Sequence, residues 1–136
     1  MAYTFWEDKN NIILSDYMDF DGEVFLINFT VKTKRNSGWN TFFIHIKTVE
    51  KYVNILEAMY RDLDGGIEIT DNESSSKIQL KKEGNEWCVS GQFCCPLNRN
   101  VQMFYFNVDQ TVIQILSTFF KNILAHYDVC PTDIIG

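Results

Sequence analysis

Residues 101–127 restrict the fold more than any other part of the chain. The segment 101–108 (VQMFYFNV) is rich in aromatic and β-branched side chains and is typical of a half- or fully buried β-strand. Asp109 follows, and its carboxylate can accept the free backbone N–H groups at the start of a helix. From Val112 onward apolar residues recur every three or four positions, which predicts a helix over residues 110–127. This helix needs an apolar surface to cover, and the preceding strand can provide one.

A second helix is predicted in the first half of the chain, over residues 49–63. Apolar residues recur there at helical spacing, and Thr48 is placed to cap the first turn. The sequence Asp64-Gly65-Gly66 is expected to end the helix, because glycine reaches the left-handed conformation without strain on a β-carbon.

The remaining segments predict strands separated by short turns. Alternating or apolar runs occupy residues 3–7, 11–15, 23–33, 39–47, 67–71, 77–82 and 86–95, and residues 16–23 form an acidic, turn-like stretch. Short turns between successive strands favour antiparallel pairing. We therefore expect one α+β domain over residues 1–136, in which a mostly antiparallel, twisted sheet of about 6–8 strands carries both helices.

The net charge and the lack of a long apolar segment predict the kind of partner and the compartment. The net charge of −6 argues against a nucleic-acid partner, whose phosphates must be neutralised by lysine and arginine, and is compatible with a basic protein partner. The first residues have no basic and apolar regions typical of a signal peptide, and no apolar run reaches the length of a membrane span. We expect a cytoplasmic protein that does not enter a membrane.

No catalytic or metal-binding motif stands out, so neither an enzyme activity nor a cofactor is expected. The acidic stretch around Asp19 and Asp21 fails the calcium-loop pattern, and His45 and His126 have no partner at a recognisable distance. Cys94 and Cys95 are adjacent in a predicted strand, so their side chains should point to opposite faces and serve mainly in packing.

The succession of elements resembles a known family over residues 39–124. The stretches that carry it are FFIHIKTVEKYVNILEAMYRDLDGGIE, KIQLKKEGNEWCVSGQF and FYFNVDQTVIQILSTFF, of which the aromatic strand with Asp109-Gln110-Thr111 is the most specific. This order is similar to the WapI-type bacterial immunity proteins. The resemblance implies a non-enzymatic cytoplasmic inhibitor that binds a cognate toxin domain, often a nuclease, and it transfers no binding residue to this chain.

Two other functions remain open at this point. A small-molecule or peptide-binding module would need a cavity between the sheet and the helices. A metal enzyme would need Asp19, Asp21 and His45 to converge. For toxin binding we expect contacts from acidic and aromatic residues of the first half of the chain, namely Tyr17, Asp19, Asp21, Glu23, Trp39, Phe43 and His45.

Overall fold

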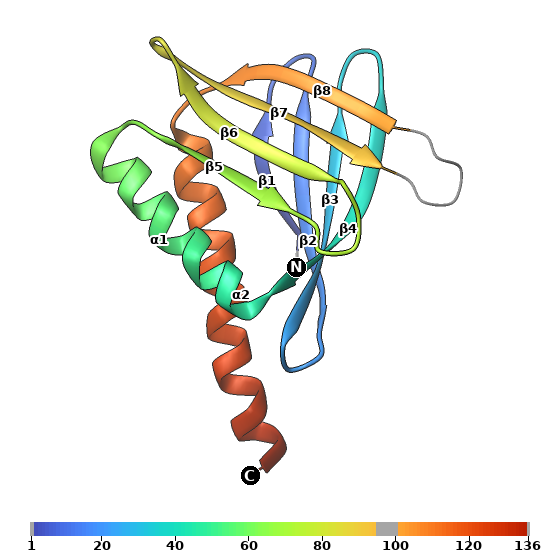
Figure 1. Cartoon of the computed structure of the whole chain (residues 1–136), viewed down its shortest axis with the longest axis vertical. Coiled ribbons are helices and arrows are strands. Elements are labelled where there is room, and N and C mark those ends of the chain that lie inside the picture. Colours follow the sequence, from blue (N-terminus) through green and yellow to red (C-terminus); the bar gives the residue numbers. More distant parts are fainter. Residues whose placement is uncertain (1, 95–100, 136) are drawn as a thin grey trace.

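The chain folds as four strands and a helix, followed by a second set of four strands and a helix (Figure 1). The computed structural model describes residues 2–94 and 101–135. The first set comprises β1 (Ala2–Glu7), β2 (Ile12–Phe20), β3 (Val24–Lys32), β4 (Ser37–His45) and α1 (Ile46–Asp62). The second comprises β5 (Gly66–Thr70), β6 (Lys77–Glu83), β7 (Glu86–Cys94), β8 (Val101–Val108) and α2 (Thr111–Ile135). This repeated order confirms the α+β class.

The strands form two antiparallel sheets, so the expectation of one sheet of 6–8 strands is wrong. Sheet A has the order β1-β2-β3-β4, and sheet B has the order β5-β6-β7-β8. Helix α1 separates β4 from β5 along the chain. The two strands therefore do not pair, and β4 is an edge strand of sheet A while β5 is an edge strand of sheet B. Each sheet has one strongly apolar face, and the two sheets cross and cover each other with these faces (Figure 1).

Strand β2 continues through most of the stretch that the sequence assigns to a turn. It runs to Phe20 and pairs with β3 along its whole length, with a bulge between Tyr17 and Asp19. The bulge interrupts the alternation of polar and apolar side chains, which hides the strand in the sequence. Phe20 stacks on Phe25 with 4.3 Å between ring centroids, and this contact anchors the end of the strand.

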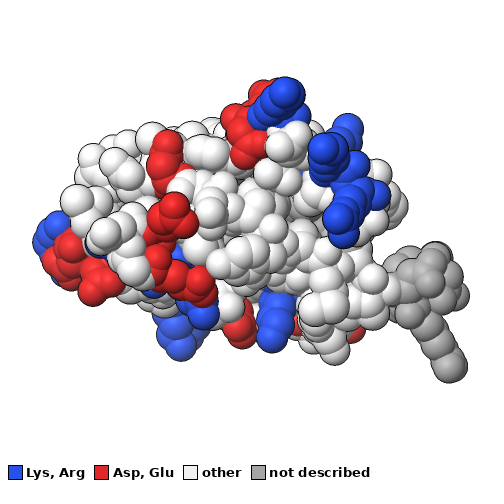
Figure 2. Space-filling view, turned by 90° about the horizontal axis from the view of Figure 1, so that it is seen from above, with Lys and Arg blue, Asp and Glu red and all other residues white. Residues whose placement is uncertain are grey.

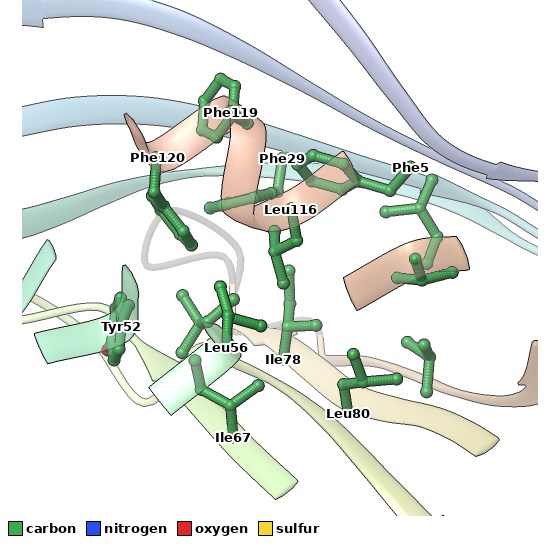
Figure 3. Packing of buried hydrophobic residues seen from close by; sticks show 14 of the residues in the cluster. Phe5, Phe29, Tyr52, Leu56, Ile67, Ile78, Leu80, Leu116, Phe119 and Phe120 are labelled. Carbon is green, nitrogen blue, oxygen red and sulfur yellow. The ribbon is translucent and has the colours of Figure 1, made fainter. Parts of the chain in front are cut away.

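One hydrophobic core joins both sheets and both helices (Figure 3). Phe119 of α2 packs edge-on against Phe5 of β1 at 5.6 Å, and Phe120 packs against Tyr52 of α1 at 5.5 Å. Most of the aromatic side chains are therefore buried in the core or packed against it. The apolar void that remains between the sheets and α2 has a volume of about 20 Å³, close to the space of a single water molecule.

At both ends of α1, the capping residue differs from the one predicted from the sequence. Helix α1 begins three residues early because His45, not Thr48, is the N-cap: its Nδ1 accepts the Lys47 backbone N–H at 3.1 Å. At the other end the left-handed residue is Leu63, with φ 50°, and Gly65 follows with φ 101°. Asp109 caps α2 as predicted, accepting the Thr111 backbone N–H at 2.9 Å, and α2 extends to Ile135.

Candidate binding surface

The outer face of sheet A, which points away from the core, carries most of the side chains proposed for binding. Cross-strand pairing places Trp39 beside Thr30 and Phe43 beside Leu26, on the edge strand β4 and its neighbour β3. Met18 reaches across β3 so that its Sδ lies 3.9 Å from the Thr41 hydroxyl. Most of this face is therefore uncharged, and it combines aromatic, aliphatic and small polar groups.

Trp39 is the most exposed aromatic residue of this face. Its side chain is 66% exposed, whereas Phe43 on the same strand is half-buried. The backbone of Phe43 is held from both sides, because its N–H donates to Asp71 Oδ1 at 2.8 Å and its carbonyl accepts the Asn72 N–H at 3.0 Å. The loop after β5 thus rigidifies β4, which makes the exposed tryptophan a preorganised contact point.

An acidic corner lies at the end of sheet A opposite Trp39. It is formed by the exposed residues Asp19, Asp21 and Glu23 of β2 and the β2–β3 turn. Asp21 Oδ1 accepts the backbone N–H groups of Val24 and Glu23, and these bonds lower the pKa of Asp21 below its ordinary value. Glu23 Oε1 lies 3.2 Å from Nε2 of His45, so the helix cap is tied to this corner.

The expected contact residues do not form one compact group. Trp39 and His45 are six residues apart on the same strand, which corresponds to about 20 Å. Tyr17 does not share the outer face with them, because it pairs with the buried Ile27 and its ring contacts His126 of α2 at 5.6 Å. The structure therefore separates Trp39, the acidic corner with His45, and Tyr17.

A basic turn adjoins Trp39 on sheet A. Lys32 pairs with Ser37 at the base of the β3–β4 turn, and Lys34 and Arg35 are exposed within it. The turn is closed by the Thr33 N–H, which donates to the Asn36 carbonyl at 2.7 Å. Positive charge and an exposed tryptophan thus occur at one end of sheet A, and negative charge at the other.

Sequence reasoning missed a second exposed apolar strip, on the outer face of β8. Val101, Met103 and Tyr105 are 55%, 70% and 61% exposed, while the neighbouring Phe104 and Phe106 point inward and are buried. Exposed and buried residues alternate along VQMFYFNV, and this alternation could have indicated the exposed strip. The segment was instead assigned to the core because it is apolar overall. The Tyr105 hydroxyl lies 3.3 Å from Cys88 Sγ and donates to Glu83 Oε2 at 3.0 Å, and these two hydrogen bonds raise the pKa of Tyr105.

The described residues form no metal site, and of two hollows that they line, one is very small and the other is open to solvent. Among the side chains that the structure describes, in residues 3–94 and 101–126, no three His, Cys, Asp or Glu gather in a way that could hold a metal ion. Asp19, Asp21 and His45 therefore do not form the metal site that the enzyme alternative requires. An open depression of about 500 Å³ beside the α1–β5 turn is lined by Asp64 and Glu68 together with Lys81 and Lys82, so its charges largely cancel. The small void in the core does not support the alternative of a ligand cavity.

The structure describes the side chains of two cysteines, Cys88 and Cys94, and these are not bonded to each other. Cys88 is buried and Cys94 is half-buried, and both are free thiols. Cys95 lies outside the described residues, so the expected division of the pair between two faces concerns a residue the structure does not describe. No helix in the described part of the chain has the length and apolar character needed to cross a membrane.

These features define an α+β domain of two crossed four-stranded sheets with polar and aromatic outer faces. No protein-family model matches the sequence, and no curated protein matches it. Solved structures share the fold. WHY3 from Arabidopsis thaliana superimposes with a TM-score of 0.57 at 8% identity, over 100% of this chain and 95% of that chain.

Two further structures extend the comparison. The plant transcriptional regulator PBF-2 has a TM-score of 0.57 at 7% identity, over 98% of this chain and 85% of that one. MRP1/MRP2 of Trypanosoma brucei has a TM-score of 0.53 at 10% identity, over 95% and 84%. At these identities the likeness establishes the fold alone.

The comparison corrects one expectation from the sequence. The net charge led us to exclude a nucleic-acid partner, but a regulator of transcription has this same fold. The basic turn beside Trp39 also shows why the total charge misleads, because phosphates respond to the local arrangement of charges and not only to their sum. The exclusion of nucleic acid is therefore wrong.

Proposed function

We propose that the chain is a non-enzymatic binding domain that neutralises a protein toxin through the outer face of sheet A. The observation that carries this proposal is the exposure of Trp39 on a rigid, mostly uncharged face. Tryptophan is the residue type most often responsible for binding energy at protein interfaces, and burying it in a partner removes its apolar surface from water.

The acidic corner gives this surface a preference for a basic partner. Asp19, Asp21 and Glu23 are exposed at the end of the sheet away from the basic turn. A toxin that acts on nucleic acid needs a positively charged active site, and carboxylates can occupy the positions meant for phosphates. The similarity of residues 39–124 to WapI-type immunity proteins supports the same proposal.

A second candidate is binding of single-stranded nucleic acid, and two observations favour it. The fold is shared with the transcriptional regulator PBF-2, and Trp39 stands beside Lys32, Lys34 and Arg35. An aromatic ring can stack on a base while neighbouring cations bind the phosphates. Both candidates use Trp39. Nucleic-acid binding adds the basic turn beside it, whereas toxin binding adds the acidic corner at the other end of sheet A.

One pair of charge reversals separates the two candidates. Trp39→Ala weakens binding in both cases, so it serves to locate the face. If a neighbouring reading frame encodes a toxin domain, Asp19→Lys weakens binding to that domain and leaves oligonucleotide binding unchanged or stronger. Arg35→Glu weakens binding of a fluorescent single-stranded oligonucleotide and leaves the toxin complex intact. Wild-type protein that binds neither probe at micromolar concentration contradicts both candidates.

A further inference from the structure

Strand β8 is the edge of sheet B, and it is the least covered of the four edge strands. Helix α2 lies against β1, α1 lies against β5, and β4 has both α1 and β7 beside it. Among the described elements, β8 makes extensive contact with β7 alone. Figure 1 shows β8 running along the top of the molecule, with its outer edge open. An open edge presents unpaired backbone N–H and C=O groups that favour pairing with another strand.

The strand also lacks the features by which proteins protect such an edge. Its eight residues contain no charged residue and no proline, and its pairing with β7 is regular from Trp87–Val108 to Cys94–Val101. By contrast, β1 carries a bulge between Thr4 and Trp6. A long, regular and uncharged edge strand in a soluble protein is expected to have a partner.

The exposed side chains of β8 fit an apolar partner strand. Val101, Met103 and Tyr105 point to the outer face, and the Tyr105 ring is held by hydrogen bonds to Glu83 and Cys88. The strand is thus preorganised, and pairing it would cover three exposed apolar side chains at a small cost in side-chain entropy.

Opposite charges mark the two ends of this strip. At the Val101 end, Gln102 Nε2 donates to the Val31 carbonyl at 3.5 Å, which brings the basic turn with Lys34 and Arg35 close to β8. At the other end, Glu86 accepts a hydrogen bond from Asn107 at 3.1 Å, and Glu83 contacts Tyr105. Seen from above, most Asp and Glu lie toward one end of the molecule, whereas Lys and Arg occur at both ends, and much of the surface between them is uncharged (Figure 2).

We propose that β8 pairs antiparallel with β8 of a second copy of this chain, so that the two B sheets become one. Antiparallel pairing around a twofold axis turns the charged ends toward each other, placing the basic turn of one copy next to Glu86 of the other. With Phe104 at the centre, Met103 lies opposite Tyr105 of the second copy on the outer face. The surface is therefore complementary to itself in both shape and charge, and the outer face of sheet A stays free.

Sedimentation velocity of the full chain over a range of concentrations tests the pairing. The wild type is expected to shift from 15.9 kDa to twice that mass as the concentration rises, and the shift should require more protein at high salt. Met103→Lys should weaken the dimer at least about tenfold, because two lysines then face each other diagonally across the new strand pair. Met18→Lys, which charges an exposed methionine on sheet A (56% exposed, against 70% for Met103), should leave the dimer unchanged.

A charge exchange identifies the orientation of the pair. Arg35→Glu and Glu86→Arg should each weaken the dimer by roughly fivefold, and a mixture of the two variants should form heterodimers at wild-type concentrations. Both sites are exposed, so thermal unfolding should confirm that each variant is folded. A wild type that stays monomeric up to high micromolar concentration overturns the proposal. A dimer that survives Met103→Lys, or β8 protected from hydrogen exchange only by a different protein, also overturns it.

Discussion

The side-chain amide of Gln102 on β8 fills the space that a β-carbon on Gly38 of β4 would occupy. A β-carbon built on Gly38 would lie 1.8 Å from Gln102 Oε1, so the two sheets approach each other here only because residue 38 has no side chain. Gly91 of β7 is more tightly enclosed, since its β-carbon would lie 2.2 Å from the Lys77 carbonyl oxygen and 2.8 Å from Phe104 Cζ. A side chain can rotate away, whereas the backbone of a paired strand cannot.

These two glycines should therefore differ in their tolerance of alanine. Gly38→Ala should lower the free energy of unfolding by about 1 kcal/mol, and Gly91→Ala by about 3 kcal/mol, because only the second change displaces a neighbouring strand. Urea denaturation measures both. Adding Gln102→Ala to Gly38→Ala should recover part of the loss. Equal effects of the two alanines would contradict this account of how the sheets meet.

Ser15 on β2 places a hydroxyl in the core without a partner. Its side chain is 1% exposed, and Oγ has no hydrogen bond within the described residues. Ser15→Ala removes this unsatisfied group and should raise the free energy of unfolding by about 1 kcal/mol. Ser76 is the matched control, because it is equally buried but its Oγ accepts the Cys94 backbone N–H at 2.8 Å. Ser76→Ala should destabilise by a similar amount, and the same sign for both variants would refute the interpretation.

The secondary structure of the second half of the chain could be predicted from the sequence because its signals are local. The alternation in β8, the cap at Asp109 and the apolar face of α2 are each encoded within a few residues, and the structure contains all three. The division into two sheets could not be predicted in this way. It depends on which apolar faces meet across the core, such as Phe42 against Phe93 at 5.9 Å, and these residues are far apart in the sequence.

The candidate surface was anticipated only in part, for a similar reason. Trp39, Asp19, Asp21 and Glu23 were selected because aromatic and charged residues can be read from the sequence, and the structure exposes all four. Their role in binding stays a prediction. Tyr17 was assigned to the same surface because the bulge in β2 could not be anticipated, and this bulge determines the face to which each neighbour points. The exposed strip of β8 was missed because an apolar strand is expected to be buried, while exposure of its edge depends on the arrangement of whole sheets.

His45 should act mainly as a helix cap, although it lies on the candidate surface. Its Nδ1 accepts the Lys47 N–H, and its Nε2 lies beside Glu23. His45→Ala removes the acceptor and should lower the free energy of unfolding by about 1 kcal/mol, whereas His45→Asn keeps a capping oxygen and should retain most of the stability. Thr48→Ala should have little effect, because Thr48 lies inside the helix. Thermal unfolding of the three variants shows whether His45 or Thr48, the residue predicted from the sequence, caps the helix.

The stability of the fold should fall in acid, and Asp21 should account for part of that fall. Backbone N–H groups of Val24 and Glu23 stabilise the Asp21 carboxylate and lower its pKa from the ordinary value of 3.8, and similar bonds lower the pKa of Asp8. A carboxyl group whose pKa is lower in the folded chain binds its proton more readily when unfolded. Its contribution to stability is therefore complete above the unfolded pKa and is lost as the pH falls through the folded value.

Urea midpoints measured between about pH 5 and pH 2 should show this loss. Asp21→Asn should flatten the dependence of the midpoint on pH below 3.8, because the asparagine oxygen still accepts the turn hydrogen bonds but has no proton to bind. Asp62→Asn is the control, since it removes an exposed carboxylate that pairs only with the Arg61 guanidinium. If Asp21→Asn leaves the slope as steep as in the wild type, the backbone hydrogen bonds of this turn do not stabilise the charged form.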